Sequence, residues 1–339
     1  MGKLPEKSIV DMHCHVAGIG AGGSGCFISD EFRKNLRFPF FLRSFGVSEE
    51  ELWEKGDILV VERLSKLLDQ SKFVEKALVL AMDGVVSDGL LDTRRTQVYV
   101  PNEFVKEAVG KYSNLLFGSS VNPYRNDALT RLDCAKKNGA VLIKWIPSIM
   151  NIDPSDKKLE PFYRKLAELK LPLLTHAGKD LSFPSTNDEL ADPERLRLPL
   201  TMGVKVIAAH VASLGRYHRK GFPPGWYHRE CSSRRLVRMM KEFSNLYADI
   251  SALTEFYRRK YLKEALTEKK IIGRLYYGSD YPLINSIMVS PLIPFHAPPL
   301  NEIISIARIR NPWDVDVRIK QALGTPTDVF AKAQELLPP

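Results

Sequence analysis

The 339-residue sequence predicts a single α/β domain built as a (β/α)8 barrel, the TIM-barrel fold. Two observations lead to this prediction. Short apolar runs with strand character recur eight times, and most are separated by polar stretches with helical periodicity. Each run also ends in a polar residue, as expected at the catalytic face of such a barrel. A doubly wound sheet is the alternative fold, and it would spread these residues along a crevice.

The predicted strands cover residues 8–12, 76–82, 115–121, 140–143, 171–175, 205–209, 245–248 and 274–279. Helical periodicity is clearest between them at 102–112, 127–138, 159–169 and 233–243. We expect the strands to be parallel, because a crossover helix brings the chain back to the same end of the sheet. Units repeated in this number close naturally into a barrel.

Long connections are expected to shape the mouth of the barrel. The segment 16–71 is far longer than a usual βα loop, and it is predicted to contain helices at 29–36 and 57–70 and to cover the mouth. Segments 179–200 and 214–231 follow the fifth and sixth strands, where insertions form substrate pockets. Helical patterns at 301–309, 315–323 and 328–336 are expected to pack on the barrel, so that residues 1–339 form one domain.

The composition is that of a globular protein, with 44% hydrophobic and 26% charged residues. No apolar run reaches about 18 residues, so we expect a cytoplasmic protein that makes no membrane contact. The four cysteines lack CxxC spacing, which argues against a thiolate zinc site and a disulfide framework. The net charge of +9 is interpreted as a solvated basic surface rather than a nucleic-acid site. The expected partner is a small-molecule substrate, and a homo-oligomer remains open.

Polar residues end the predicted strands and would lie around one mouth of the barrel; they are His13, Asp83, Asn122, Lys144, His176, His210, Asp249 and Asp280. Among them the histidines and Asp280 suggest a metal site. His13 and His15 are one residue apart, so on a strand both point to the same face. Neutral imidazole is the most common metal ligand in proteins. The chain has only seven histidines, and their concentration at strand ends favours a metal site over separate core histidines.

Five motifs occur in order along most of the chain: DMHCH at 11–15, LIKWIPS at 142–148, LLTHAG at 173–178, VIAAH at 206–210 and YGSDYP at 277–282. With them the sequence resembles the amidohydrolase superfamily. The resemblance is strongest to the branch that contains amino-carboxymuconate-semialdehyde decarboxylase and many metal-dependent hydrolases.

The resemblance implies a divalent metal held by His13, His15, His176 and Asp280. Zinc is the expected ion, with manganese and iron(II) as alternatives and one or two ions per chain. His210 would then polarise the substrate or transfer a proton, although in binuclear relatives the matching histidine is itself a ligand. Lys144 matches the position where binuclear members carry a carboxylated lysine. An unmodified Lys144 that binds an anionic substrate or forms an ion pair is the alternative.

The predicted reaction is hydrolysis of a C–N or C–O bond in a small, carboxylate-bearing substrate. A divalent ion lowers the pKa of a bound water from about 16 toward about 7. Asp280 is expected to accept the proton of that water and His210 to stabilise the oxyanion. Trp145, Arg216 and Tyr281 are candidate substrate contacts. Their alternative interpretations are core packing for the aromatic residues and a solvent-facing charge for the arginine.

Other functions remain open at this stage. A non-oxidative decarboxylase would use the same metal geometry on a carboxylated ring. A TatD-like nuclease also begins with an aspartate and His-Cys-His, but it typically has a glutamate at the position of Lys144 and a different motif around the last aspartate. A barrel that binds metal without catalysis is the third alternative, although closed structural sites are rare at a barrel mouth.

Overall fold

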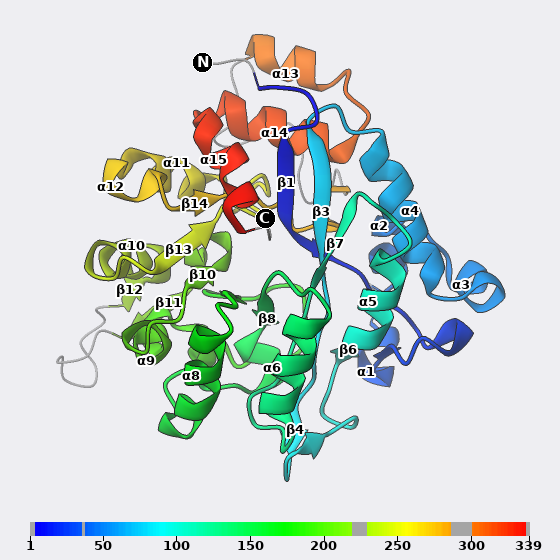
Figure 1. The fold of residues 1–339 in the computed structure, drawn as a ribbon. Helices are drawn as coiled ribbons and strands as arrows, with labels where there is room; N and C mark the ends of the chain where they lie inside the picture. The colour runs from blue at the N-terminus through cyan, green and yellow to red at the C-terminus, as the bar shows by residue number, and fades with distance from the viewer. Residues whose placement is uncertain (1–3, 36–37, 219–228, 286–299, 337–339) are drawn as a thin grey trace.

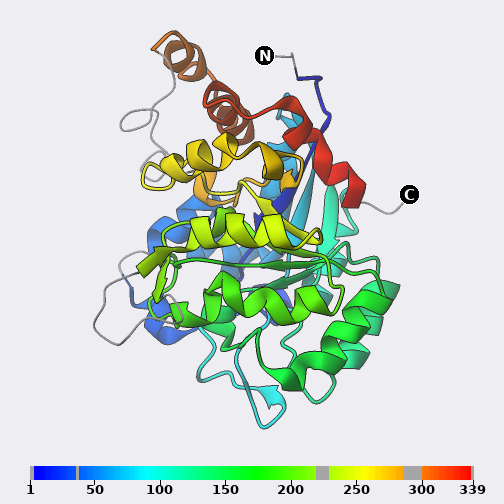
Figure 2. The same cartoon turned by 90° about the vertical axis from the view of Figure 1, so that its left-hand side faces the viewer.

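The computed structural model describes residues 4–35, 38–218, 229–285 and 300–336. Eight parallel strands follow one another around a central barrel, with helices outside them (Figures 1 and 2). They are β1 (Ile9–His15), β3 (Val74–Leu80), β7 (Leu115–Gly118), β8 (Ile143–Trp145), β9 (Leu173–Thr175), β10 (Val206–Ala208), β13 (Leu246–Asp249) and β14 (Leu275–Tyr276). All eight coincide with predicted strands to within a few residues, which confirms the predicted architecture.

Single bridges close the ring of strands. The continuous ladders run β1-β3-β7 and β8-β9-β10-β13-β14. Ser119, just after β7, forms a parallel bridge with Ile143 of β8, and Cys14 of β1 forms one with Tyr281 after β14. The amide of His15 also donates to the Tyr281 carbonyl at 2.8 Å. Hydrogen bonding therefore continues around the whole (β/α)8 barrel.

Strand β1 contains one extra residue relative to β3, and this bulge changes the direction in which its histidine side chains point. Between Asp11 and Cys14, β1 advances three residues while β3 advances two. Met12 belongs to the small core inside the barrel, whereas Cys14 packs in the outer core between strands and helices. Strict alternation would turn His13 away from the face of Met12, but a bulge changes the face to which successive side chains point. His13 and His15 therefore lie inside the barrel, above Met12.

Amphipathic helices cover the outside of the barrel. They are α5 (Asn102–Val109), α6 (Ala128–Lys137), α8 (Glu160–Glu168), α9 (Arg197–Thr201), α10 (Ser232–Glu242), α11 (Arg259–Thr267) and α12 (Lys269–Ile272). In α8, for example, Phe162, Tyr163 and Leu166 are buried while its charged side chains face water. The short helix α7 (Pro147–Met150) follows β8 directly.

The long β1–β3 connection is divided into several short elements. It contains β2 (Phe27–Ile28), α1 (Asp30–Arg33), α2 (Phe38–Ser44), α3 (Glu49–Lys55) and α4 (Ile58–Asp69). The helix expected at 57–70 is present as α4, whereas the one expected at 29–36 is shorter. Helices α2 and α3 were not predicted. The signal for α3 is a capping box, in which Ser48 and Glu51 satisfy each other's backbone amides.

Small β pairs and three helices complete the fold. β2 pairs with β6 (Val98–Tyr99), while β4 (Val86–Ser87) with β5 (Leu90–Leu91) and β11 (Arg216–His218) with β12 (Arg229–Cys231) form antiparallel pairs. The predicted C-terminal helices correspond to α13 (Leu300–Ile306), α14 (Pro312–Ala322) and α15 (Thr327–Ala331). In the described part of the chain, no helix has the length and hydrophobicity needed to cross a membrane.

Candidate metal centre

Three side chains from opposite ends of the sequence converge inside the mouth of the barrel. His13 and His15 come from β1, and Asp280 follows β14. Their ligand atoms lie within 4.8 Å of one another. Nε2 of His13 is 3.1 Å from Nε2 of His15, and Oδ1 of Asp280 lies 3.5 Å from the first nitrogen and 3.4 Å from the second. Barrel closure brings them together, because β1 and β14 are neighbours in the ring.

The spacing of this cluster fits a small divalent cation. Ligand atoms at tetrahedral corners about 2.0–2.1 Å from a zinc ion are about 3.3–3.4 Å apart. The three separations in the cluster, 3.1, 3.4 and 3.5 Å, are close to this value. Two imidazole nitrogens and one carboxylate oxygen are also a donor set typical of zinc. The residues present therefore fit a metal ion.

Asp249, the last residue of β13, fixes the orientation of His13. Its Oδ2 lies 2.7 Å from Nδ1 of His13, and both side chains are fully buried. Because an ionised carboxylate only accepts hydrogen bonds, Nδ1 carries the proton and Nε2 keeps its lone pair. Asp249 is therefore a positioning residue behind the cluster. The sequence placed Asp249 at a strand end but gave no reason to assign it this role.

His210 lies behind the same group of residues. Its ring is stacked on that of His13, with centroids 5.1 Å apart, and its Nε2 is 3.9 Å from Oδ2 of Asp280. Nδ1 of His210 lies 3.1 Å from the Ser251 carbonyl, which can only accept. Nδ1 is thus the protonated nitrogen, and Nε2 presents a lone pair to the cluster. This favours a proton acceptor or a ligand over the oxyanion donor expected from the sequence.

The backbone at His210 is held in an uncommon conformation. His210 and Val211 have φ values of 56° and 48°, in the left-handed region that β-branched residues rarely adopt. The His210 amide donates to Oδ1 of Asp249 at 2.8 Å, which ties this turn to the residue that orients His13. Backbone strain of this kind often accompanies a functional site.

His176 is near the cluster but outside its tight group. Its ring centroid is 5.0 Å from that of His210, and Nδ1 lies 3.8 Å from a carboxylate oxygen of Asp180. Nε2 of His176 and Nδ1 of His15 are buried without a hydrogen-bond partner among the described residues. For His176, the unpartnered Nε2 is consistent with a ligand atom, because burial without a partner is otherwise costly.

Lys144 approaches the cluster from β8. Its Nζ is fully buried and lies 2.8 Å from Nε2 of His13. Burial lowers the pKa of Lys144 to about 8. The ammonium group donates to the lone pair that His13 would otherwise offer to a cation, so Lys144 competes with a metal for that nitrogen.

The protonation states favour cation binding. Burial, assisted by the charge of Lys144, lowers the pKa of His13 to about 4. Burial also lowers the pKa of His176 and of His210. The nitrogens of His13, His15 and His210 surround Asp280, and the pKa of its carboxyl lies well below the usual value although burial opposes ionisation. Neutral imidazoles next to an ionised carboxylate are the forms that bind divalent metals.

The three candidate substrate contacts lie away from this cluster. Trp145 follows Lys144 on β8 and so points outward, where its buried indole packs on Phe162 and donates to the Val121 carbonyl at 2.7 Å. The buried ring of Tyr281 stacks on Trp313 with centroids 4.8 Å apart. Arg216 is exposed on β11. Alternation along β8 explains the outward position of Trp145. The packing of the two aromatic residues and the exposure of Arg216 match the alternative interpretations, and a substrate contact by these residues stays a prediction.

Arg258 is a buried arginine that no pattern in the sequence singled out. Arg258 follows β13, and its Nε donates to Oε2 of Glu255 at 2.7 Å. It also donates to the Ser213 hydroxyl. Ser213 follows His210 by three residues, and Arg258 also donates to the carbonyl of Lys179, three residues after His176, at 3.5 Å, so it joins the loops that follow the two histidines. Its sequence context, a basic helical stretch, pointed instead to a solvent-facing charge.

Comparisons with known proteins identify the family and the fold of the chain. The amidohydrolase family model matches residues 10–292. Similar solved structures include an uncharacterized TIM-barrel protein from Bordetella bronchiseptica, which is 14% identical with a TM-score of 0.54 and 97% of each chain covered. A protein provisionally assigned as a 2-pyrone-4,6-dicarboxylic acid hydrolase from Pseudomonas putida is 14% identical with a TM-score of 0.53 and the same coverage. A search of curated proteins found no match.

Proposed function

This chain belongs to the amidohydrolase family, and from that premise we propose that it is a metal-dependent hydrolase acting on a C–N or C–O bond of a small, carboxylate-bearing substrate. The observation that carries the proposal is the convergence of His13, His15 and Asp280 within 4.8 Å inside a barrel mouth. In barrels of this type the carboxyl ends of the strands form the catalytic face. The residues there are neutral imidazoles and an ionised carboxylate, the forms needed to hold a cation.

His13, His15, His176 and Asp280 would hold the ion, for which zinc is proposed. When bound, a divalent ion supplies Lewis acidity and makes a water molecule acidic enough to act as a nucleophile near neutral pH. Asp249 supports this ligand set from behind, because it keeps Nε2 of His13 free of a proton. The number of ions follows from Lys144, which we propose remains unmodified, so that one ion is bound per chain.

Asp280 is the proposed general base. Its Oδ1 faces the two histidines of β1 and its Oδ2 faces His210, so the carboxylate lies between the proposed metal position and the remaining basic nitrogen. In this position it can take a proton from the attacking water and deliver it to the leaving group. Nε2 of His210 also has a free lone pair, so His210 can accept a proton during the reaction.

Arg258 supports an anionic substrate. A guanidinium buried beside the cluster is a strong recognition element for a carboxylate, because charge-assisted hydrogen bonds are stronger where water is excluded. Its present partner is Glu255, and burial raises the pKa of Glu255 to about 7. A substrate carboxylate could therefore replace a partner that carries a full charge only part of the time at neutral pH.

The decisive experiment is an isotope-labelled reaction. Purified protein is stripped with a chelator, reloaded with zinc, manganese or iron(II), and incubated with a panel of carboxylated lactones, amides and esters in H₂¹⁸O. Metal-dependent incorporation of ¹⁸O into the product supports hydrolysis. Release of carbon dioxide without ¹⁸O incorporation would instead identify a decarboxylase. Full activity in the stripped protein would show that the reaction does not need a metal and would contradict the proposal.

A further inference from the structure

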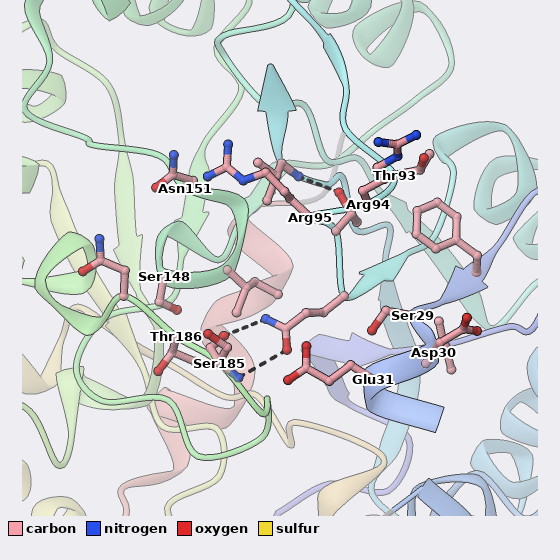
Figure 3. A pocket seen from close by; sticks show the side chains of 17 residues that line it. Ser29, Asp30, Glu31, Thr93, Arg94, Arg95, Ser148, Asn151, Ser185 and Thr186 are labelled. Carbon is pink, nitrogen blue, oxygen red and sulfur yellow. Dashed lines mark hydrogen bonds between the residues drawn. The ribbon is translucent and has the colours of Figure 1, made fainter. Parts of the chain in front are cut away.

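Exposed polar contacts join the loops around the mouth of the barrel. Two of them lie at Ser185 and are drawn as dashed lines in Figure 3. Gln97 donates through Nε2 to the Ser185 carbonyl at 2.6 Å, and the Ser185 amide donates to Oε1 of Gln97 at 3.4 Å. Contacts that water can replace contribute little to holding side chains in place. A set of fully buried polar contacts lies instead behind the metal cluster, where β1 and β14 meet.

Asp11, the first residue of the DMHCH motif, accepts four hydrogen bonds in the core. Its side chain is fully buried. Oδ1 accepts from the amides of His13 at 3.0 Å and Ser279 at 2.9 Å. Oδ2 accepts from the Cys14 thiol at 2.9 Å and from Nε1 of Trp313 at 2.7 Å. An ionised carboxylate has about four lone-pair sites and no donor, so each site of this buried group has a partner.

One oxygen of Asp11 joins the two backbone segments that carry the first and the last proposed ligand. His13 lies in the bulge of β1, and Ser279 directly precedes Asp280. β14 ends at Tyr276, so the backbone at Ser279 lies beyond the strand. There Asp11 accepts from the Ser279 amide, and the Asp280 amide donates to the His13 carbonyl at 2.9 Å. These contacts fix the backbone from which His13 Nε2 and Asp280 Oδ1 approach to 3.5 Å.

Helix α14 holds the segment that precedes Asp280. The fully buried Nζ of Lys320 donates to the Gly278 carbonyl at 2.8 Å and to Oδ2 of Asp316 at 2.6 Å. A Cβ on Gly278 would lie only 2.9 Å from Cβ of His13, so glycine allows this segment to pack directly on the histidine. The position of Asp280 relative to His13 is thus tied to α14.

Trp313, also on α14, contacts both strands. Its Nε1 donates to Asp11 of β1, and its ring stacks on that of Tyr281, with centroids 4.8 Å apart and planes 9° apart. Tyr281 directly follows Asp280. Trp313 and Lys320 are seven residues apart, a spacing that places them on one face of the helix. This face of α14 therefore contacts the backbone on both sides of Asp280.

We propose that Asp11 and Trp313 are positioning residues that set the separation between the metal ligands His13 and Asp280. The inference rests on the proposed metal-dependent function and deepens it, because neither residue touches the ion or the substrate. It gives a role to the first residue of the DMHCH motif and to a helix at the far end of the chain.

The test measures zinc affinity of the chelator-stripped full chain by competition with a chromogenic chelator. Trp313→Phe keeps the stacked ring and removes the donor to Asp11, and we expect it to weaken zinc binding about tenfold, the lower end of the usual cost of losing an outer-shell contact. The matched control is Tyr163→Phe, which keeps its ring and loses a buried hydrogen bond to the Pro154 carbonyl on the outside of the barrel. It should bind zinc like the unmodified chain, even where urea denaturation shows both variants to be less stable.

A double variant tests whether the two residues act as a pair. Asp11→Asn keeps one oxygen for the two amides but presents an NH₂ group to the Trp313 donor, so zinc binding should weaken by about 10- to 100-fold. Adding Trp313→Phe removes the opposed donor, and the double variant should bind zinc about as tightly as Trp313→Phe alone.

Three results would overturn the inference. Zinc affinity that is unchanged in both single variants, with only their stability lowered, would make the contacts merely structural. Losses that multiply in the double variant would show that the two residues do not act together. An unmodified chain that binds no zinc would contradict the proposed function as well, whereas the first two results contradict this inference alone.

Discussion

Asp249 accepts a hydrogen bond from Nδ1 of His13 across 2.7 Å, and this buried contact decides which nitrogen of His13 faces the metal cluster. Without the carboxylate, His13 could carry its proton on Nε2, and that nitrogen would be lost as a ligand. The pair links β13 to β1 across the inside of the barrel. The position of β13 relative to β1 therefore determines which nitrogen of His13 can bind a metal.

Replacing Asp249 by alanine should weaken metal binding about 10- to 100-fold, the usual cost of losing the partner of a ligating histidine. The affinity is measured by competition with a chromogenic chelator at pH 7.5. Asp133→Ala, which removes an exposed carboxylate on α6, is the matched control and should bind metal like the unmodified chain. Equal affinities for all three proteins would show that His13 is oriented by other contacts.

Replacing Asp280 by asparagine should lower kcat by about 10²–10⁴-fold, because the amide cannot accept a proton from water. The fold should persist, since the Asp280 amide donates to the His13 carbonyl through the backbone and this bond remains. Turnover of the substrate found in the panel is compared with circular dichroism and metal content. A rate close to that of the unmodified protein would remove Asp280 from catalysis.

Metal analysis should find about one divalent ion per chain in both the unmodified protein and Lys144→Met. The reason is that an unmodified Lys144, whose Nζ lies 2.8 Å from Nε2 of His13, supplies no bridging oxygen for a second ion. Elemental analysis after dialysis gives the count. Two ions per chain that fall to one in Lys144→Met would instead indicate a carboxylated lysine that bridges a pair of metals.

Glu255 should make the free energy of unfolding fall as the pH rises toward neutrality. Burial raises its pKa from 4.5 to about 7, so the folded chain holds a proton that the unfolded chain releases above pH 4.5. The contribution of Glu255 to the free energy of unfolding is complete below pH 4.5 and is lost as the pH rises through about 7. The free energy of unfolding of Glu255→Gln minus that of the unmodified chain should therefore rise by about 2–3 kcal/mol from pH 5 to pH 8.

This difference is measured by urea denaturation of both proteins at the two pH values. Glu302→Gln, which removes a part-exposed carboxylate paired with Arg318, is the control and should show little pH-dependent gain. If the free energies of unfolding of the two proteins differ by the same amount at pH 5 and pH 8, the pKa of Glu255 is not raised in the folded state.

Local patterns in the sequence predict most of the fold and the types of residue in the site. Eight apolar runs with a helix between most of them specify a barrel, since parallel strands need long crossovers. The spacing of His13 and His15 places them on one face because side chains alternate along a strand. These properties depend on neighbours in the sequence, so they can be predicted without coordinates. Arg216, by contrast, stood out only as a charge near a predicted mouth and proved to be exposed.

The sequence by itself determined the order of the strands and the placement of histidines and aspartates at their carboxyl ends. Only the tertiary structure decided how these side chains meet. The bulge in β1 turns His13 inward, and the closure of β14 on β1 brings Asp280 to within 3.5 Å of it. Asp249 became a partner of His13 because β13 and β1, far apart in the sequence, are separated only by β14 in the ring. Such contacts depend on register and ring closure, to which residues distributed over the whole chain contribute.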